Sequence, residues 1–237
     1  MDIAAIWSYL QIVVIDIALA GDNAVVIAMA AHTLPKPQRY KAIAVGAAAA
    51  IVMRVTITVI VTYLLRIPFL SAIGGAVVLW IAAKLLIEEA EAEGPAHQVK
   101  GFWHAIWIIA VADFVMSTDN MLAVAGAAEG AWDRILFGLG LSIPIIMFCS
   151  GVISNLMDRY PILEDIGAGI LGWVGGKMIA DDGWIKPWLG AHAGWIKWVL
   201  PAFCAVGVIA VGRTLSRLWA PTAPEPEKKA EAPAPHP

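Results

Sequence analysis

Two copies of the pattern Asp-x5-Asp-Asn lie in long apolar stretches of this 237-residue chain. The two copies are formed by Asp16, Asp22 and Asn23 and by Asp113, Asp119 and Asn120. A charged side chain at the centre of a bilayer costs roughly 2.5–3.5 kcal/mol on insertion scales, so such residues are rare in apolar spans unless binding or transport needs them. The repetition of these polar groups at one spacing therefore indicates a site for binding or transport.

The residues just before the second Asp of each copy suggest how the motif is shaped. On a regular helix the first Asp and the Asn share a face, whereas the second Asp lies about 120° away. Gly21 precedes Asp22, and Ser117-Thr118 precedes Asp119. Small and hydroxyl residues suit a local unwinding, which is tolerated at membrane depth where the backbone lines a cavity. We therefore expect each helix to break here and to turn its second Asp toward a shared cavity.

The donor set of the two motifs is rich in oxygen. It contains carboxylates, amide oxygens and the hydroxyls of Ser117 and Thr118, with no His or Cys in either motif. Such hard ligands favour Mg²⁺, Ca²⁺ or Mn²⁺ over Zn²⁺ or Cu⁺. Met116 flanks the second motif, and its thioether would favour the softer Mn²⁺ if it reached the ion. Packing is the commoner role of methionine, so both roles of Met116 stay open.

Arg54 falls near the middle of another apolar stretch. A guanidinium there would be very costly alone, so we expect it to face one of the motif carboxylates. The four Asp residues and Arg54 sum to a charge of -3, and a bound divalent ion leaves -1. A shared proton could balance that charge, because close carboxylates raise one another's pKa. Proton-coupled transport is one hypothesis for Arg54, and a structural Arg–Asp pair that locks the fold is the other.

The elements that position these residues are membrane helices. The chain is 60% hydrophobic and 15% charged, whereas soluble domains carry about 25% charged residues. About 20 mainly apolar residues cross the hydrocarbon core as a helix. We predict an all-α membrane protein with seven transmembrane helices, at about 4–31, 40–65, 67–87, 102–128, 131–155, 161–180 and 198–218.

The Asp motifs belong to a longer internal repeat. They match at an offset of 97, and a downstream series of Pro, Gly, Trp, Lys and paired acids matches at an offset of 93. Two units of three spans must enter the membrane in opposite senses, so we predict inverted repeats whose motifs meet near the midplane. The predicted divisions are a first repeat at 1–93, a linker at 94–100, a second repeat at 101–186, a seventh transmembrane helix at 187–219 and a disordered Pro-rich tail at 220–237. The spacing Gly172-x3-Gly176 predicts a close helix contact.

Loop charges predict the orientation. The side that holds the 1–2, 3–4 and 5–6 loops and the C-terminus carries most of the Lys and Arg residues outside the spans. The positive-inside rule then places the C-terminus in the cytoplasm and the N-terminus outside.

The stretches LAGDNAVVIAMA and MSTDNMLAVAGAA, in the first and fourth of seven spans, resemble the TerC family of integral membrane proteins. The Gly-Asp-Asn of the first copy is most similar to the YjbE-like branch of that family. The resemblance covers residues 3–218 and implies a multi-pass protein of the bacterial inner membrane that exports metal ions, chiefly Mn²⁺. It carries the metal site over to the six Asp and Asn residues of the motifs. Ala20-Gly21 stands where the second copy has Ser117-Thr118, so the two half-sites are unequal.

Together these features favour a divalent metal-ion transporter, with Mn²⁺ efflux by alternating access as the leading interpretation. The ion is a substrate, with no cofactor or enzymatic activity expected, and no P-loop motif suggests ATP use. The expected partners are the cation and the lipid bilayer, with no nucleic acid, and a homodimer stays open. The alternatives are a non-transporting membrane assembly or stress factor, linked to the tellurite-resistance label of some relatives, and, more remotely, an intramembrane aspartyl protease.

Overall fold

The protein is helical throughout the part that the structure describes. The computed structural model describes residues 21–64, 67–93, 101–127, 132–190 and 193–219. Residues 21–32 are helical. The helices that follow are α2 (Lys36–Leu64), α3 (Leu70–Glu93), α4 (Phe102–Ala127), α5 (Trp132–Met157), α6 (Ile162–Asp181), α7 (Lys186–Leu189) and α8 (Ala193–Trp219). The all-helical class is confirmed over these residues.

The long helices follow the predicted spans to within a few residues, and the largest difference is at the end of the third. The third helix runs to Glu93, six residues past the predicted end of its span at 87. Its last turns are made of Glu and Ala, which are good helix formers, so the helix continues after the apolar stretch has ended. Among the described residues, Lys36–Ile57, Leu70–Glu91 and Gly194–Ser216 are long and apolar enough to cross a membrane. The count of seven spans and the inverted repeats stay predictions.

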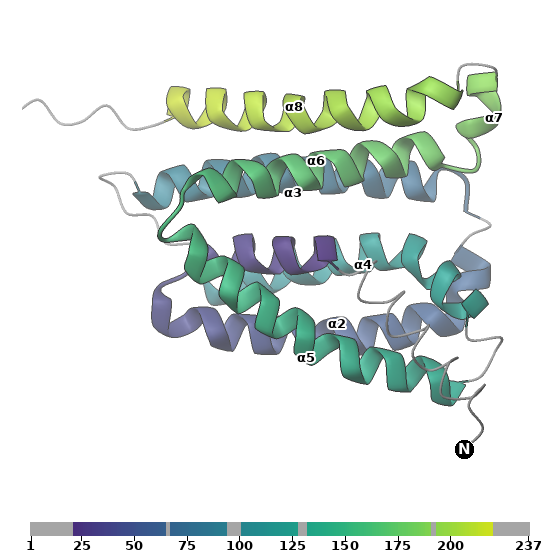
Figure 1. Cartoon of the computed structure of the whole chain (residues 1–237), viewed down its shortest axis with the longest axis horizontal. Coiled ribbons are helices and arrows are strands. Elements are labelled where there is room, and N and C mark those ends of the chain that lie inside the picture. Colours follow the sequence, from purple (N-terminus) through teal and green to yellow (C-terminus); the bar gives the residue numbers. More distant parts are fainter. Residues whose placement is uncertain (1–20, 65–66, 94–100, 128–131, 191–192, 220–237) are drawn as a thin grey trace, which may run out of the picture.

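The helices form two layers (Figure 1). In the upper layer α6 packs against α3 and α8, and α3 also contacts α8; we call this the α3–α6–α8 bundle. In the other layer α2 packs against α4 and α5, which gives the α2–α4–α5 bundle. The helix at residues 21–32 contacts both, since Val25 and Met29 lie against Gly167 of α6 while Ile27 lies near Ala47 of α2.

Glycines allow the helices of the α3–α6–α8 bundle to approach closely. A Cβ placed on Gly175 would lie 2.8 Å from the carbonyl oxygen of Gly75, so α6 and α3 meet backbone to backbone. A Cβ on Gly172 would lie 2.7 Å from Cα of Ala205, and one on Gly176 equally close to Cα of Pro201. The close contact predicted from Gly172-x3-Gly176 is therefore confirmed, and α8 is its partner.

Candidate functional site

Arg54 and Asp113 form an ion pair inside the α2–α4–α5 bundle. The Nε and Nη2 atoms of Arg54 donate hydrogen bonds of 3.2 and 3.0 Å to Oδ1 of Asp113. The two side chains are only 2% and 3% exposed. An Asp does face Arg54, as its cost in an apolar span required.

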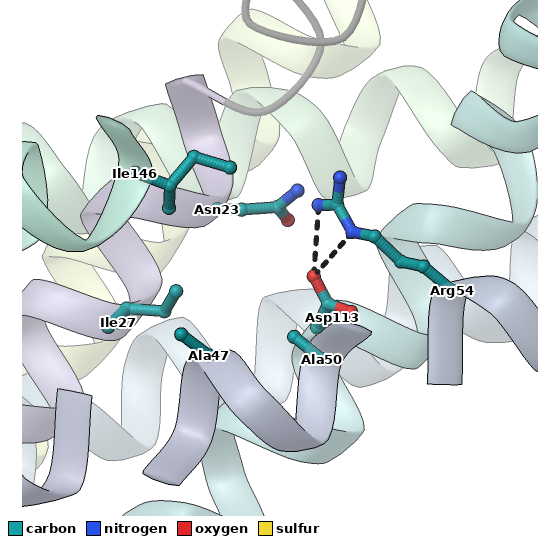
Figure 2. A pocket seen from close by; sticks show the side chains of 7 residues that line it. All are labelled: Asn23, Ile27, Ala47, Ala50, Arg54, Asp113 and Ile146. Carbon is teal, nitrogen blue, oxygen red and sulfur yellow. Dashed lines mark hydrogen bonds and ion pairs between the residues drawn. The ribbon is translucent and has the colours of Figure 1, made fainter. Parts of the chain in front are cut away.

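Asn23 lies beside this pair in a small cavity between helices. The cavity leaves about 10 Å³ for the centre of a water-sized sphere, and residues of the 21–32 helix, α2, α4 and α5 line it. Figure 2 shows the Asn23 amide pointing toward the Arg54–Asp113 pair, and the other residues that line the cavity are apolar. The Asn23 side chain is buried, and neither its oxygen nor its nitrogen has a hydrogen-bond partner among the described residues. The structure thus brings together one residue from each motif with Arg54.

The other predicted site residues are placed less completely. Asp22 is half-buried, and its Oδ1 accepts a 2.9 Å hydrogen bond from the backbone N–H of Asn23. Asp22 also interacts electrostatically with the positive charges of Arg54 and Lys177. Asp16 lies outside the described residues. Asp119 and Asn120 lie in the continuous helix α4, but their side chains are outside the described part.

The expected break in the second motif is wrong, because α4 continues without interruption through Ser117 and Thr118. Thr118 Oγ1 donates a 2.9 Å hydrogen bond to the carbonyl of Phe114 four residues earlier. This bond satisfies the hydroxyl inside the helix, so the residue type does not force unwinding. Met116 belongs to the apolar core rather than to the lining of the cavity, which fits its packing role.

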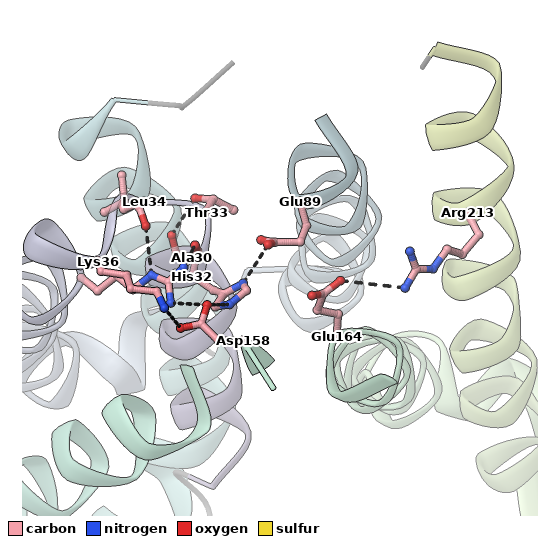
Figure 3. A network of polar contacts seen from close by, with 10 residues as sticks. Ala30, His32, Thr33, Leu34, Lys36, Glu89, Asp158, Glu164 and Arg213 are labelled. Atoms are coloured by element: carbon pink, nitrogen blue, oxygen red, sulfur yellow. Dashed lines mark hydrogen bonds and ion pairs between the residues drawn. The ribbon is translucent and has the colours of Figure 1, made fainter. Parts of the chain in front are cut away.

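The sequence did not predict a second polar cluster (Figure 3), which lies where the 21–32 helix, α3 and α5 end and α6 begins. His32 Nδ1 lies 2.8 Å from Glu89 Oε1, and His32 Nε2 lies 2.9 Å from Asp158 Oδ1. Glu164 of α6 is buried beside them, and His32, Glu89 and Glu164 each offer one ligand atom that lies within 4.8 Å of the other two. The sequence feature that could have indicated this cluster is His32 directly after the first predicted span, together with the paired acids after the third. Polar residues in such positions are usually interpreted as solvated helix ends.

Asp158, just after α5, anchors this cluster. Its carboxylate receives hydrogen bonds from Lys36, Arg39 and His32. Burial is the largest single influence on the pKa of Asp158 and raises it, but the hydrogen bonds from these neighbours outweigh burial and lower it to about 2. Asp158 is therefore an ionised acceptor at neutral pH.

Long apolar helices, buried charges between them and an apolar outer surface define a multi-pass helical membrane protein. Residues 1–218 match the family described as "Integral membrane protein TerC family". The chain belongs to that family.

Three similar proteins are described as membrane proteins. The chain is 40% identical over 202 residues to "Uncharacterized membrane protein YjbE" of Bacillus subtilis, covering 85% of this chain and 92% of that protein. It is 28% identical to "Uncharacterized membrane protein YkoY" of the same bacterium, covering 73% of this chain and 59% of that one. It is 24% identical to "UPF0053 inner membrane protein YgdQ" of Escherichia coli, covering 71% and 78%. No solved structure matches the chain.

Proposed function

We propose that this protein exports divalent metal ions, Mn²⁺ above all, across the bacterial inner membrane by alternating access. The observation that carries the proposal is the Asn23 amide, which is 2% exposed beside Arg54 and Asp113 and has no hydrogen-bond partner among the described residues. Leaving a buried polar group unsatisfied costs about 1–3 kcal/mol. An ion bound in the adjoining cavity would satisfy this amide, since the Asn23 and Asp113 side chains line the same space.

The donors suit a hard cation. Mn²⁺ and Mg²⁺ are bound by carboxylate and amide oxygens, whereas softer ions prefer sulfur and imidazole. Asp22 directly precedes Asn23, and Asp119 and Asn120 follow Asp113 within two turns of α4. The space of about 10 Å³ is close to that of one water, so an ion would enter it largely dehydrated. The resemblance to exporters of the TerC family makes Mn²⁺ the leading substrate.

Arg54 supplies a counter-charge for the transport cycle. Its guanidinium holds Asp113 Oδ1, one of the oxygens that an ion in this cavity would need. Ion and guanidinium therefore compete for one carboxylate, and Arg54 balances its charge in the ion-free state. Release of Arg54 as the ion binds, with a proton that moves in exchange, would couple export to the proton gradient.

The test is Mn²⁺ flux into proteoliposomes that contain the full chain. The Asp22→Asn and Asp119→Asn substitutions keep side-chain size but remove a charge from each motif, so we expect flux to fall at least about tenfold in either variant. Asp181→Asn is the matched control, because Asp181 is exposed at the end of α6, 3.9 Å from Lys186. Flux that persists in both motif variants would contradict the site.

The same vesicles distinguish the proposal from the non-transporting alternative. A pH gradient should drive Mn²⁺ movement, and its collapse should slow that movement. Folded wild-type protein that moves no divalent cation under any gradient would favour an assembly or stress factor in which Arg54–Asp113 is purely structural.

A further inference from the structure

We propose that His32, Glu89 and Glu164 form a second divalent-cation site, selective for transition metals and separate from the Asp-Asn motifs. These three residues, the triad, come from three helices: the 21–32 helix, α3 and α6. All three are buried, with exposures of 7%, 7% and 4%. Figure 3 shows the imidazole and the Glu89 carboxylate facing each other, with Glu164 beside them.

The spacing of the donor atoms fits one ion. The three ligand atoms all lie within 4.8 Å of one another. Ligands about 2.0–2.2 Å from a common ion lie roughly 3–4 Å apart, so small rotations of the side chains would complete the site. Two carboxylates also carry the two negative charges that balance a divalent ion.

The hydrogen bond on the far side of His32 favours metal ligation by Nδ1. Nε2 lies 2.9 Å from Asp158 Oδ1, so its N–H can donate a hydrogen bond to that carboxylate. Histidines that bind metals commonly donate their other N–H to a carboxylate in this way, which fixes the tautomer. The other ring nitrogen, Nδ1, then faces Glu89, with Oε1 at 2.8 Å. In this tautomer Nδ1 carries no proton and can ligate a metal ion. Two electron-rich atoms that close together call for a cation between or beside them.

A proton on Nδ1 is the other cation that would satisfy this contact. A proton links only His32 and Glu89, whereas a metal ion is ligated by all three residues. Three other cations lie nearby: Lys36 and Arg39 contact Asp158, while Arg213 donates bonds of 2.7 and 2.9 Å to Asp165 and forms a longer ion pair of 3.9 Å with Glu164.

The mixed donor set predicts the ligand class. One imidazole with two carboxylates suits Mn²⁺, Fe²⁺, Co²⁺ and Zn²⁺, while Mg²⁺ and Ca²⁺ prefer oxygen alone. The motifs contain no histidine. An imidazole bound to the ion is therefore a signature of the triad that the transport site cannot produce.

Pulsed electron paramagnetic resonance of Mn²⁺ bound to the purified full chain reads that signature. We expect ¹⁴N coupling from one imidazole in the wild-type protein, and its loss in His32→Gln. His104→Gln is the matched control, because His104 bonds to Glu88 rather than to the triad. Bound Mn²⁺ without imidazole coupling in the wild-type protein would overturn the proposal without any variant.

Affinity measured by calorimetry separates this site from the proposed transport site. In the Asp22→Asn/Asp119→Asn background we expect one Mn²⁺ per chain to remain, with at least about tenfold weaker binding after Glu89→Gln but not after the neighbouring Glu88→Gln. Glu164→Gln is a second test should Glu89→Gln not fold. No remaining binding in that background, or binding indifferent to Glu89 and Glu164, would overturn the triad alone. Binding at the triad without Mn²⁺ flux would instead overturn the transport proposal.

Discussion

At the scale of single residues, the buried Arg54–Asp113 pair affects both the stability of the fold and the proposed ion site. Two buried charges must be balanced against each other, because desolvation of each costs several kcal/mol. The pair joins α2 to α4 in the same place where Asn23 leaves an unsatisfied amide. The same contact can therefore fix the fold and hold an ion-binding carboxylate ready.

Removal of one member should destabilise the protein strongly. Asp113→Asn removes the charged acceptor of two hydrogen bonds from a guanidinium that is 2% exposed, so we expect a loss of roughly 3–5 kcal/mol. Unfolding of the purified protein in detergent micelles measures this. Asp165→Asn is the control, because its pair with Arg213 is partly exposed and should cost far less. Equal midpoints for both variants would refute the difference.

A double substitution separates structure from transport. Replacement of both members by apolar residues, Arg54→Met with Asp113→Leu, should recover much of the stability lost in Asp113→Asn, since no charge is left buried alone. We expect this folded variant to move no Mn²⁺ in proteoliposomes. Normal flux in it would show that neither charge serves transport.

At the scale of elements, the packing of α3 on α6 sets the geometry of the α3–α6–α8 bundle. Gly75 and Gly175 bring the two backbones into contact, which leaves no room for a side chain at either position. Glu89 and Glu164, two members of the triad, lie on these same two helices.

Gly175→Ala tests that contact. The new methyl group would lie 2.8 Å from the carbonyl oxygen of Gly75 and 2.9 Å from Cγ of Leu79, so the helices must separate. We expect destabilisation of about 1–3 kcal/mol despite the better helix propensity of alanine. Gly207→Ala on α8 is the matched control, because nothing lies within 4 Å of its added Cβ. There the same substitution should be neutral or stabilising.

The offset of 93 links the two ends of this helix pair. It equates Glu89 with Asp182 and Ser71 with Glu164. Asp182 accepts a 3.1 Å hydrogen bond from the backbone N–H of Ala72, beside Ser71, at the start of α3. Asp182 is thus hydrogen-bonded by a backbone N–H, whereas its counterpart Glu89 faces His32 and Glu164 in the triad. The duplication stays a prediction, and it would explain why acids recur at both ends with different partners.

At the scale of the molecule, the sequence predicted the helices well because membrane spans follow from apolar length alone. It also anticipated the pairing of Arg54 with an Asp, since a lone buried charge is so costly. It failed to anticipate the unbroken α4, because hydroxyl groups can bond within a helix as readily as disrupt it. The triad could not be predicted from the sequence, since the triad depends on contacts among residues 57 or more positions apart. No local sequence pattern indicates which helix ends lie together.

Orientation can be tested on the whole chain. The start of α2 and the short helix α7 lie at opposite ends of the bundles (Figure 1); Lys36 is the first residue of α2, and Trp188 belongs to α7. With Cys149 and Cys204 replaced by alanine, an impermeant maleimide added to intact cells should label Trp188→Cys. It should label Lys36→Cys only after permeabilisation, because the positive-inside rule places that end in the cytoplasm. The reverse pattern would invert the predicted topology.

The helix at residues 21–32 carries both Asn23 and His32, nine residues apart and thus about 13 Å along one rod. A shift or rotation of that rod changes both sites together. If each site binds an ion, the two equilibria are thermodynamically linked, and whatever factor an ion at the triad imposes on affinity at Asn23, an ion there must impose in return. Metal supply sensed at one end of the helix would then set the loading of the other.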